Sequence, residues 1–236
     1  MADTPSWNDA DRPTPEDEKL AGYVIGWHEG RLAGGIRHDY HHRAHSIGED
    51  HVFTLLDREG FFAGNAPVLD VGCGPSPHVG SHLNTHAGEQ EVYFLDVDPT
   101  MLKLHRALSH EFQHAELGRV ARREYWLLGD ALDEPYLLTD KAVLVHRTLP
   151  RSRTGPHALA PGTPEAVRLT LESLLSARPH RLALYLDGGH DLHCPEHPAR
   201  VRGALDALGA KYRVVEGVAS ADFTPREGGT LLYLTP

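Results

Sequence analysis

The spacing of apolar residues changes near residue 63, and the change predicts a helical segment followed by an α/β domain. Before that point, Leu20, Tyr23, Val24 and Trp27 recur at i, i+3, i+4 and i+7, the spacing of one helix face. After it, short and nearly continuous apolar runs alternate with helical stretches. Continuous runs are typical of parallel strands that are buried on both faces. We expect such strands at residues 68–71, 92–95, 125–128, 142–145 and 182–186.

The connections between these runs predict how the strands are arranged. The helical stretches 99–117 and 164–177 each begin with proline, which suits the first turn of a helix. Strands that alternate with helices are typical of an α/β fold with a parallel sheet. The last two runs, 212–215 and 230–234, are joined by a loop without room for a crossover helix, so we expect them to pair antiparallel.

These patterns divide the chain into a flexible tail (1–17), a helical cap or lid (18–62) and an α/β domain (63–236). The tail contains three prolines, many acidic residues and few apolar ones, a composition that does not support a packed core. In the cap, His38, His41, His42 and His45 have helical spacing and therefore share one stripe. We expect this stripe to face solvent; the alternative is a metal bound by its i, i+4 pairs, for which no carboxylate partner is evident.

Composition and charge narrow the class of protein. The 236 residues are 40% hydrophobic and 24% charged, values of an ordinary globular protein. Without an apolar run of about 20 residues, and with an acidic N-terminus, we expect neither a membrane span nor a secretory signal. A formal net charge of −10 would repel a phosphate backbone, so nucleic acid is not an expected partner. The only cysteines, Cys73 and Cys194, fit a reducing compartment, and we expect a cytoplasmic protein.

The most informative stretch is a glycine-rich turn after the first expected strand, in APVLDVGCGPSPHVG (66–80). Gly72 and Gly74 lack side chains, so the backbone of this turn can closely approach a ligand. The next strand ends in Asp96, whose carboxylate can accept hydrogen bonds from both hydroxyls of a ribose. The third strand ends in Gly129, Asp130 and Ala131, which offer a carboxylate and a backbone N–H group to an amine.

In an open parallel sheet, the carboxyl ends of neighbouring strands converge on one crevice. We therefore expect Asp70, Asp96 and Asp130 to lie near the same ligand. The alternative is that these three carboxylates merely cap the helices that follow them. Cys73, between the two glycines, is expected to be a small buried residue of the core.

The segments VLDVGCG (68–74), FLDVDPTML (94–102) and LLGDAL (127–132) resemble the first three motifs of class I S-adenosylmethionine-dependent methyltransferases. The resemblance runs from about residue 66 to the C-terminus. It implies a Rossmann-like three-layer sandwich with a seven-stranded, mostly parallel sheet and a closing antiparallel hairpin. It also implies an enzyme with S-adenosyl-L-methionine as its cofactor, and a cap that closes over the ligand.

The resemblance further implies which residues hold the cofactor. The expected contacts are Asp70, Gly72, Gly74 and Ser76 at the methionine part, Asp96 at the ribose, Asp130 and Ala131 at the adenine edge, and His146 near the methyl group. Ser76 replaces the third glycine of the family's GxGxG turn and follows Pro75. A GxGP turn followed by a small hydroxyl residue is similar to that of some small-molecule amine N-methyltransferases. A GxGxxG site for NAD would require glycine where Pro77 stands.

Candidate catalytic residues follow the fourth and fifth strands or lie in the cap. The sequence HRTLPRS (146–152) replaces the Asn/Asp-Pro-Pro-aromatic signature, which argues against amide and nucleobase N-methylation. His146 is a candidate general base, because an imidazole titrates near neutral pH; the alternative is a loop histidine that bonds only the backbone. Tyr40 and His190 are further candidates.

The loop 187–197 could hold a divalent ion or form a polar wall of the pocket. It matches no standard ligand spacing, so no metal is expected.

Three functions are compatible with these features. The leading hypothesis is a methyltransferase that acts on O or N of a small molecule, either as a monomer or as a homodimer. The second is an enzyme of the same fold that attacks the aminocarboxypropyl chain of the cofactor and releases methylthioadenosine. The third is a non-catalytic subunit that only binds the cofactor. The nucleoside product separates the first two, since methyl transfer releases S-adenosylhomocysteine.

Overall fold

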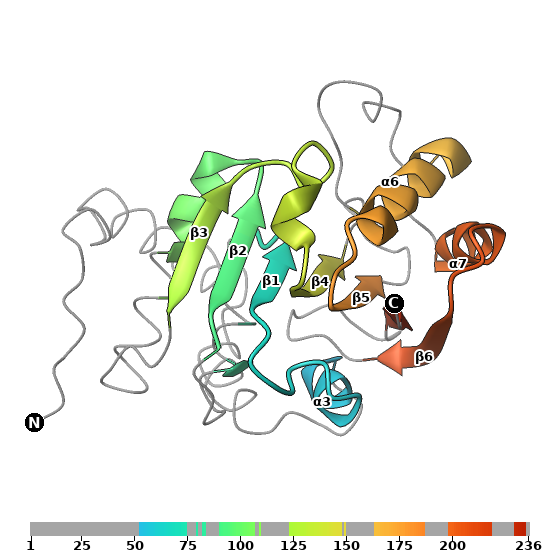
Figure 1. Cartoon of the computed structure of the whole chain (residues 1–236), viewed down its shortest axis with the longest axis horizontal. Coiled ribbons are helices and arrows are strands. Elements are labelled where there is room, and N and C mark those ends of the chain that lie inside the picture. The colour runs from blue at the N-terminus through green and yellow to red at the C-terminus, as the bar shows by residue number, and fades with distance from the viewer. Residues whose placement is uncertain are drawn as a thin grey trace, which may run out of the picture.

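The computed structural model describes residues 52–74, 79, 82–83, 90–106, 109, 123–147, 149, 163–186, 198–218 and 229–234. These residues contain one seven-stranded sheet (Figure 1). All seven strands predicted from the apolar runs are present, and all but the first are slightly longer than expected. The strands are β1 (Val68–Val71), β2 (Val92–Asp96), β3 (Glu124–Leu128), β4 (Ala142–Arg147), β5 (Arg181–Leu186), β6 (Tyr212–Val218) and β7 (Gly229–Leu234).

The strand order across the sheet is β3-β2-β1-β4-β5-β7-β6. The first five strands in this order pair in parallel, whereas β7 is antiparallel to both β5 and β6. These pairings confirm the predicted α/β fold with a mostly parallel sheet and a closing antiparallel pair. The sequence pattern did not predict that the last strand lies between β5 and β6.

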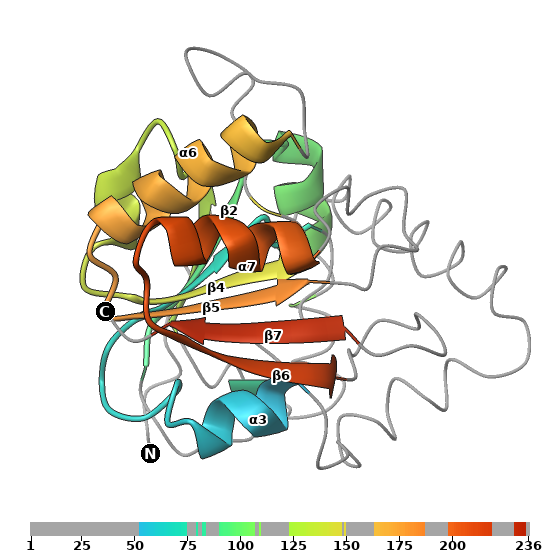
Figure 2. The same cartoon turned by 90° about the vertical axis from the view of Figure 1, so that its right-hand side faces the viewer.

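Helices cover both faces of the sheet. The helices α6 (Pro164–Ser176) and α7 (Pro198–Ala207) lie on one face, and α3 (Val52–Arg58) lies on the other (Figure 2). The α6 helix starts where the sequence predicted, because Thr163 accepts a hydrogen bond from the Ala166 N–H group and Pro164 fits the first turn. Of the helix predicted for 99–117, residues 99–106 and 109 are helical and the others are not described.

The connection from β3 to β4 contains the short 3-10 helix η2 (Pro135–Leu138) in place of a full α-helix. In the described part of the chain, no helix has both the length and the apolar character needed to cross a membrane.

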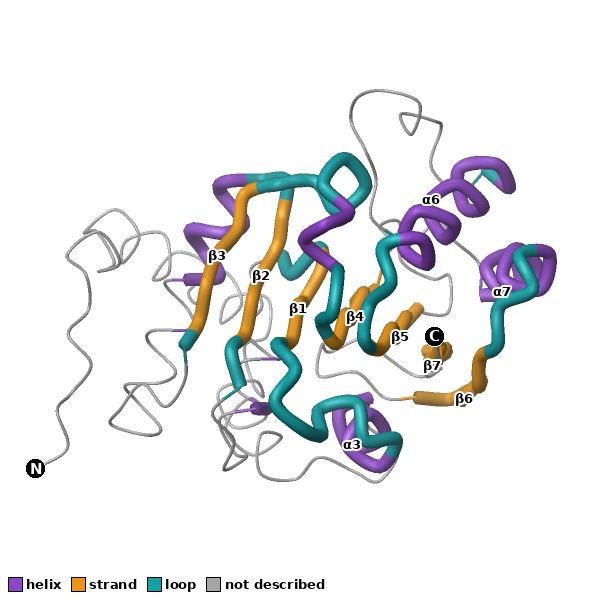
Figure 3. The backbone as a smooth tube through the Cα atoms, viewed as in Figure 1, coloured by secondary structure: helices purple, strands orange, loops and turns teal. Residues whose placement is uncertain are grey.

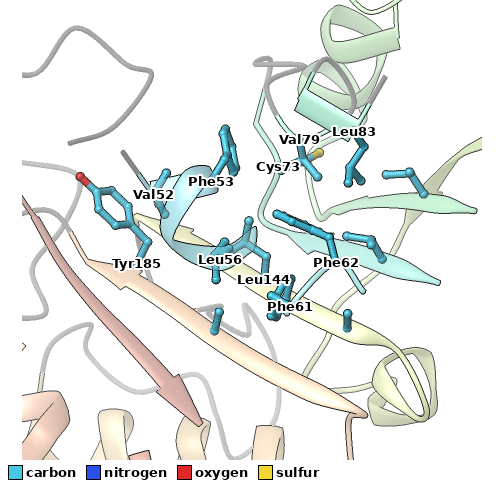
Figure 4. Close-up of a cluster of buried hydrophobic side chains, with 14 of the residues drawn as sticks. Val52, Phe53, Leu56, Phe61, Phe62, Cys73, Val79, Leu83, Leu144 and Tyr185 are labelled. Atoms are coloured by element: carbon cyan, nitrogen blue, oxygen red, sulfur yellow. The ribbon is translucent and has the colours of Figure 1, made fainter. Parts of the chain in front are cut away.

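Two apolar cores pack against the two faces of the sheet, because successive side chains of a strand point to opposite sides. The core on the α3 side includes Val68, Phe94 and Leu144 together with the side chains of α3. Figure 4 shows this core, with Val52, Phe53 and Leu56 of α3 beside the sheet. The core on the α6 side contains Leu69 and Val71 of β1, and Val167, Leu171, Leu174, Val201 and Leu205 of the two helices.

The segment that joins α3 to β1 is fixed to the sheet by hydrogen bonds to its backbone. Arg181 of β5 donates from Nη1 to the carbonyl oxygens of Phe61 (2.9 Å) and Ala63 (2.8 Å). Gln90 donates from Nε2 to the carbonyl oxygen of Gly64 at 2.8 Å. Residues 52–62, the described part of the predicted cap, therefore belong to the packed body of the sheet. The tail and residues 18–51 lie outside the described residues.

Candidate functional site

The turns after β1, β2 and β3 lie along one edge of the sheet (Figure 3). Hydrogen bonds join them: the N–H groups of Gly72 and Cys73 donate to the Leu95 carbonyl oxygen at 2.8 and 3.3 Å. The N–H group of Gly129 donates to the Asp96 carbonyl oxygen at 3.1 Å. The structure therefore brings together the three strand ends that the sequence singled out.

The turn after β1 combines a left-handed backbone at two glycines with open space beside them. Gly72 and Gly74 have φ angles of +69° and +57°, a region that side-chain-bearing residues rarely adopt. A Cβ atom added to either glycine would meet no protein atom within 4 Å. The glycines are therefore not needed to avoid a clash within the described protein, and the space beside them is available to another molecule.

The carboxylate of Asp96 is half-buried at the end of β2. Its Oδ2 atom accepts a hydrogen bond from the Gly74 N–H group at 3.0 Å, and its Oδ1 atom accepts one from the Asp98 N–H group at 2.9 Å. A carboxylate offers about four lone-pair positions. With one backbone donor on each oxygen, each oxygen retains one position for a ligand hydroxyl.

Asp70 and Cys73, just before and within the turn, are buried on the α3 side of the sheet. Asp70 is 2% exposed and lies opposite Phe94 and Leu144 in the neighbouring strands. Cys73 is buried, as the sequence predicted. Its burial, and then the charges of Asp70 and Asp96, raise the pKa of the Cys73 thiol well above its usual range. The thiol is thus kept protonated and unreactive.

Asp130 and Ala131 follow β3. The Asp130 Oδ1 atom accepts a hydrogen bond from the Leu132 N–H group at 2.8 Å, while Ala131 is buried in the α6-side core. Next to this turn, Glu134 Oε1 lies 3.1 Å from where a Cβ atom on Gly129 would be. The Asp130 carboxylate therefore stabilises its own turn and remains partly accessible.

The alternative that the predicted carboxylates only cap helices does not hold for Asp96. The helix at residues 99–106 is capped by Asp98, whose Oδ1 atom accepts a hydrogen bond from the Thr100 N–H group at 2.8 Å. The sequence analysis did not predict this cap, although an aspartate before a proline is a usual helix-start signal.

The sequence analysis also did not predict two exposed apolar side chains beside the site, Val97 (36% exposed) and Leu128 (62% exposed).

Several predicted site residues are not placed by the structure. His146 lies in β4 opposite Tyr185 of β5, but its side chain is not described. Ser76, Tyr40 and His190 lie outside the described residues, as do the histidine stripe 38–45 and the loop 187–197. Among the residues that are described, no group of three or more histidine, cysteine, aspartate or glutamate side chains could hold a metal ion.

Comparison with known proteins gives matches at the level of structure. No protein-family model matches the sequence, and no curated protein sequence matches it. Among solved structures, the small RNA methyltransferase HEN1 is similar with a TM-score of 0.53 and 13% identity, over 76% of this chain and 24% of that chain.

Two bacterial structures are similar over most of their own length. A Clostridium thermocellum protein assigned as an rRNA methylase has a TM-score of 0.50 and 12% identity, over 78% of this chain and 96% of that one. A Listeria monocytogenes protein assigned to the class I S-adenosylmethionine-dependent methyltransferases has a TM-score of 0.51 and 13% identity, over 92% and 68%. Such identities establish a shared fold. The chain has the Rossmann-like fold of class I S-adenosylmethionine-dependent methyltransferases.

Proposed function

We propose that this protein binds S-adenosyl-L-methionine and transfers its methyl group to an oxygen or nitrogen atom of a small molecule. One observation carries the proposal: the open glycine turn after β1 is hydrogen-bonded to the carboxylate of Asp96 at the end of β2. This arrangement offers a backbone cradle and a diol acceptor side by side, as an adenosine with a chain on its 5′ carbon requires.

Each part of the cofactor has a proposed partner at the strand ends. The two free lone-pair positions of Asp96 accept the two ribose hydroxyls, one on each oxygen. Gly72 and Gly74, with Ser76, line the methionine part.

The adenine edge is bound by Asp130 and the Ala131 N–H group. The exposed side chains of Val97 and Leu128 supply apolar surface beside it. Because Asp70 is almost inaccessible, it favours the ammonium group by its negative charge rather than by direct contact.

The bound cofactor supplies the methyl group and its leaving group, so the protein needs chiefly to align and desolvate the acceptor. His146, near the end of β4, is proposed as the general base that takes the proton of the acceptor. Tyr40 and His190 are proposed to position the acceptor. This division of roles explains how the protein can function without a strong catalytic motif.

The net charge favours a small acceptor over RNA. Two of the three similar structures given above are named for RNA substrates, but they share only 12–13% of their residues with this chain. A protein that neutralises several phosphates needs a concentration of Lys and Arg, whereas this chain carries 23 basic and 33 acidic residues. We therefore propose a small molecule as the acceptor and include RNA in the test.

The decisive experiment identifies the nucleoside product. The full chain is incubated with S-adenosyl-L-methionine and, separately, a panel of small metabolites and total RNA. We expect S-adenosylhomocysteine and a methylated metabolite. Methylthioadenosine as the product would instead indicate attack on the aminocarboxypropyl chain. Methylated RNA would overturn the small-molecule acceptor, and calorimetric binding of the cofactor without turnover of any compound would favour a non-catalytic subunit.

A further inference from the structure

The Asp96 side chain holds the end of the glycine turn as well as facing the proposed ribose site. Gly74 lies 22 residues before Asp96 in sequence, yet its N–H group donates to Asp96 Oδ2 at 3.0 Å. The two preceding N–H groups, of Gly72 and Cys73, donate to the main-chain carbonyl of Leu95. The start of the turn is thus held by the backbone of β2, whereas its end is held by a side chain.

This difference matters because glycine has the largest conformational freedom of any residue. At Gly74, φ is +57°, and an added Cβ atom would meet no protein atom, so side-chain packing does not hold it in place. A hydrogen bond from an N–H group to a charged carboxylate is stronger than one to a neutral carbonyl. The contact with Asp96 is therefore a main restraint on the end of the turn.

We infer that Asp96 is a positioning residue for the methionine-binding turn in addition to its proposed contact with the ribose. The identity of the ligand in this inference rests on the proposed function. The contact between Asp96 and Gly74 does not depend on it. It means that the two halves of the cofactor site are mechanically linked through one carboxylate. Loss of that carboxylate then weakens binding of the methionine part, which it does not touch.

The variant Asp96→Asn separates the two roles, because it keeps the size of the side chain. Its amide oxygen can still accept the hydrogen bond from the Asp98 N–H group. Asparagine side chains favour this bond to the N–H group two residues on, so the amide nitrogen faces the Gly74 N–H group, and two donors cannot bond. Asp130→Asn is a matched control: it removes the same charge from the neighbouring strand end, where Oδ1 accepts from the Leu132 N–H group and not from the N–H groups of Gly72, Cys73 or Gly74.

The first measurement is amide hydrogen exchange by NMR without any ligand. In Asp96→Asn, we expect the protection of the Gly74 amide to fall about tenfold or more, the effect of losing one hydrogen-bond acceptor. The Gly72 amide, bonded to Leu95, should keep its protection, and both amides should be unchanged in Asp130→Asn. Unchanged protection of Gly74, or an equal fall at Gly72 and Gly74, would overturn the inference.

The unmodified protein gives a second reading if the variant does not fold. In the unmodified protein without ligand, the Gly74 amide should be protected from exchange, as the Gly72 amide is, because both N–H groups donate hydrogen bonds. An unprotected Gly74 amide beside a protected Gly72 amide would contradict the proposed contact.

The third measurement compares the affinities of S-adenosyl-L-methionine and methylthioadenosine, which lacks the aminocarboxypropyl chain. A variant that is merely less stable would weaken both ligands by the same factor, and the effect of a lost negative charge on the sulfonium is given by Asp130→Asn. We expect the ratio of the two affinities to change about tenfold more in Asp96→Asn than in Asp130→Asn. The same ratio in Asp96→Asn and Asp130→Asn would reject the positioning role. If the wild-type protein binds neither compound, the proposed function fails, and the amide exchange still decides the role of Asp96 in the turn.

Discussion

Gly72 has a left-handed backbone and a proposed contact with the ligand. The effect of the backbone angle can be separated from that of the contact by comparison with a glycine of the same geometry. Its φ is +69°, and that of Gly209, just after α7, is +68°. An added Cβ atom would meet no protein atom at either position. A left-handed conformation costs an L-residue about 1–2 kcal/mol, so Gly72→Ala and Gly209→Ala should destabilise the protein by similar amounts.

Only Gly72→Ala should also weaken S-adenosyl-L-methionine, by about tenfold or more, because its Cβ atom enters the proposed ligand space. Urea unfolding gives the stabilities and calorimetry gives the affinities. If both variants bind the cofactor equally well, the ligand does not closely approach Gly72.

Tyr93 predicts a pH dependence of stability. Partial burial, and a hydrogen bond from its hydroxyl to Glu91 Oε2 at 2.8 Å, raise the pKa of Tyr93 to about 12 from a usual value of 10. Between these two pH values, the unfolded chain loses this proton while the folded protein keeps it. The free energy of unfolding should therefore decrease as the pH rises from 10 to 12, and this contribution should be complete below pH 10.

Tyr93→Phe is the control for this effect, since phenylalanine keeps the ring that stacks on Tyr125 with centroids 4.8 Å apart. Urea unfolding at several pH values should show a smaller decrease between pH 10 and 12 in the variant. An identical decrease in both proteins would mean that Tyr93 does not contribute.

At this scale, the sequence predicted residue types and positions better than their contacts. Asp70, Gly72, Gly74 and Asp96 were all singled out by their place at strand ends. The bond between Gly74 and Asp96 was not predicted, because it depends on β1 and β2 being neighbours at the correct register.

At the scale of elements, Arg181 fixes the α3–β1 connection to β5 through two carbonyl oxygens. Arg181→Ala should lower the free energy of unfolding by about 1–3 kcal/mol, because hydrogen bonds from a charged donor are lost. Arg168→Ala is the matched control: its guanidinium bonds Glu172 on the exposed face of α6, and such pairs contribute about 0.3–0.5 kcal/mol. Equal effects in urea unfolding would show that the connection is held in another way.

Gly229 and Gly203 should respond oppositely to alanine. At Gly229, the first residue of β7, a Cβ atom would lie 2.6 Å from the Tyr185 hydroxyl and 2.7 Å from the Leu186 carbonyl oxygen. The hydroxyl is held by its hydrogen bond to the Val218 carbonyl at 3.1 Å. Gly229→Ala should therefore cost about 1–3 kcal/mol, the range for overpacking.

Gly203 lies on the exposed side of α7 with open space around it. Gly203→Ala should stabilise the protein by about 0.5–1 kcal/mol, because alanine loses less backbone entropy in a helix. Thermal unfolding of the two variants should show shifts of opposite sign. A stabilised Gly229→Ala would mean that β5 and β7 have room to separate.

At the scale of the whole molecule, the 18 histidines predict a change of charge at mildly acidic pH. Adding 18 positive charges to the formal net charge of −10 makes it +8, and the unperturbed histidine pKa is about 6.5. The net charge therefore passes through zero below that pH, where repulsion between molecules is smallest. We expect light scattering to pass through a maximum near the pH of zero net charge as the pH falls from 8 to 5. Constant scattering over this range would contradict the prediction.

The amino-acid sequence by itself determined which segments form strands and where a ligand-binding turn lies. Continuous runs of apolar residues indicate strands that are buried on both faces of a sheet, and closely spaced glycines indicate a turn with a free backbone. Both signals are local properties of the chain. Hence all seven strands and the 72–74 turn were predicted.

Only the tertiary structure decided how these parts are placed against one another. The antiparallel character of β6 and β7 followed from their short connection, but a pairing pattern does not say which strand of a hairpin joins the sheet. Packing placed β7 against β5 and left β6 at the edge. The link from Asp96 to Gly74 has the same origin, since a contact across 22 residues exists only once two strands lie side by side. Local sequence sets what each segment can form, and long-range packing sets which segments meet.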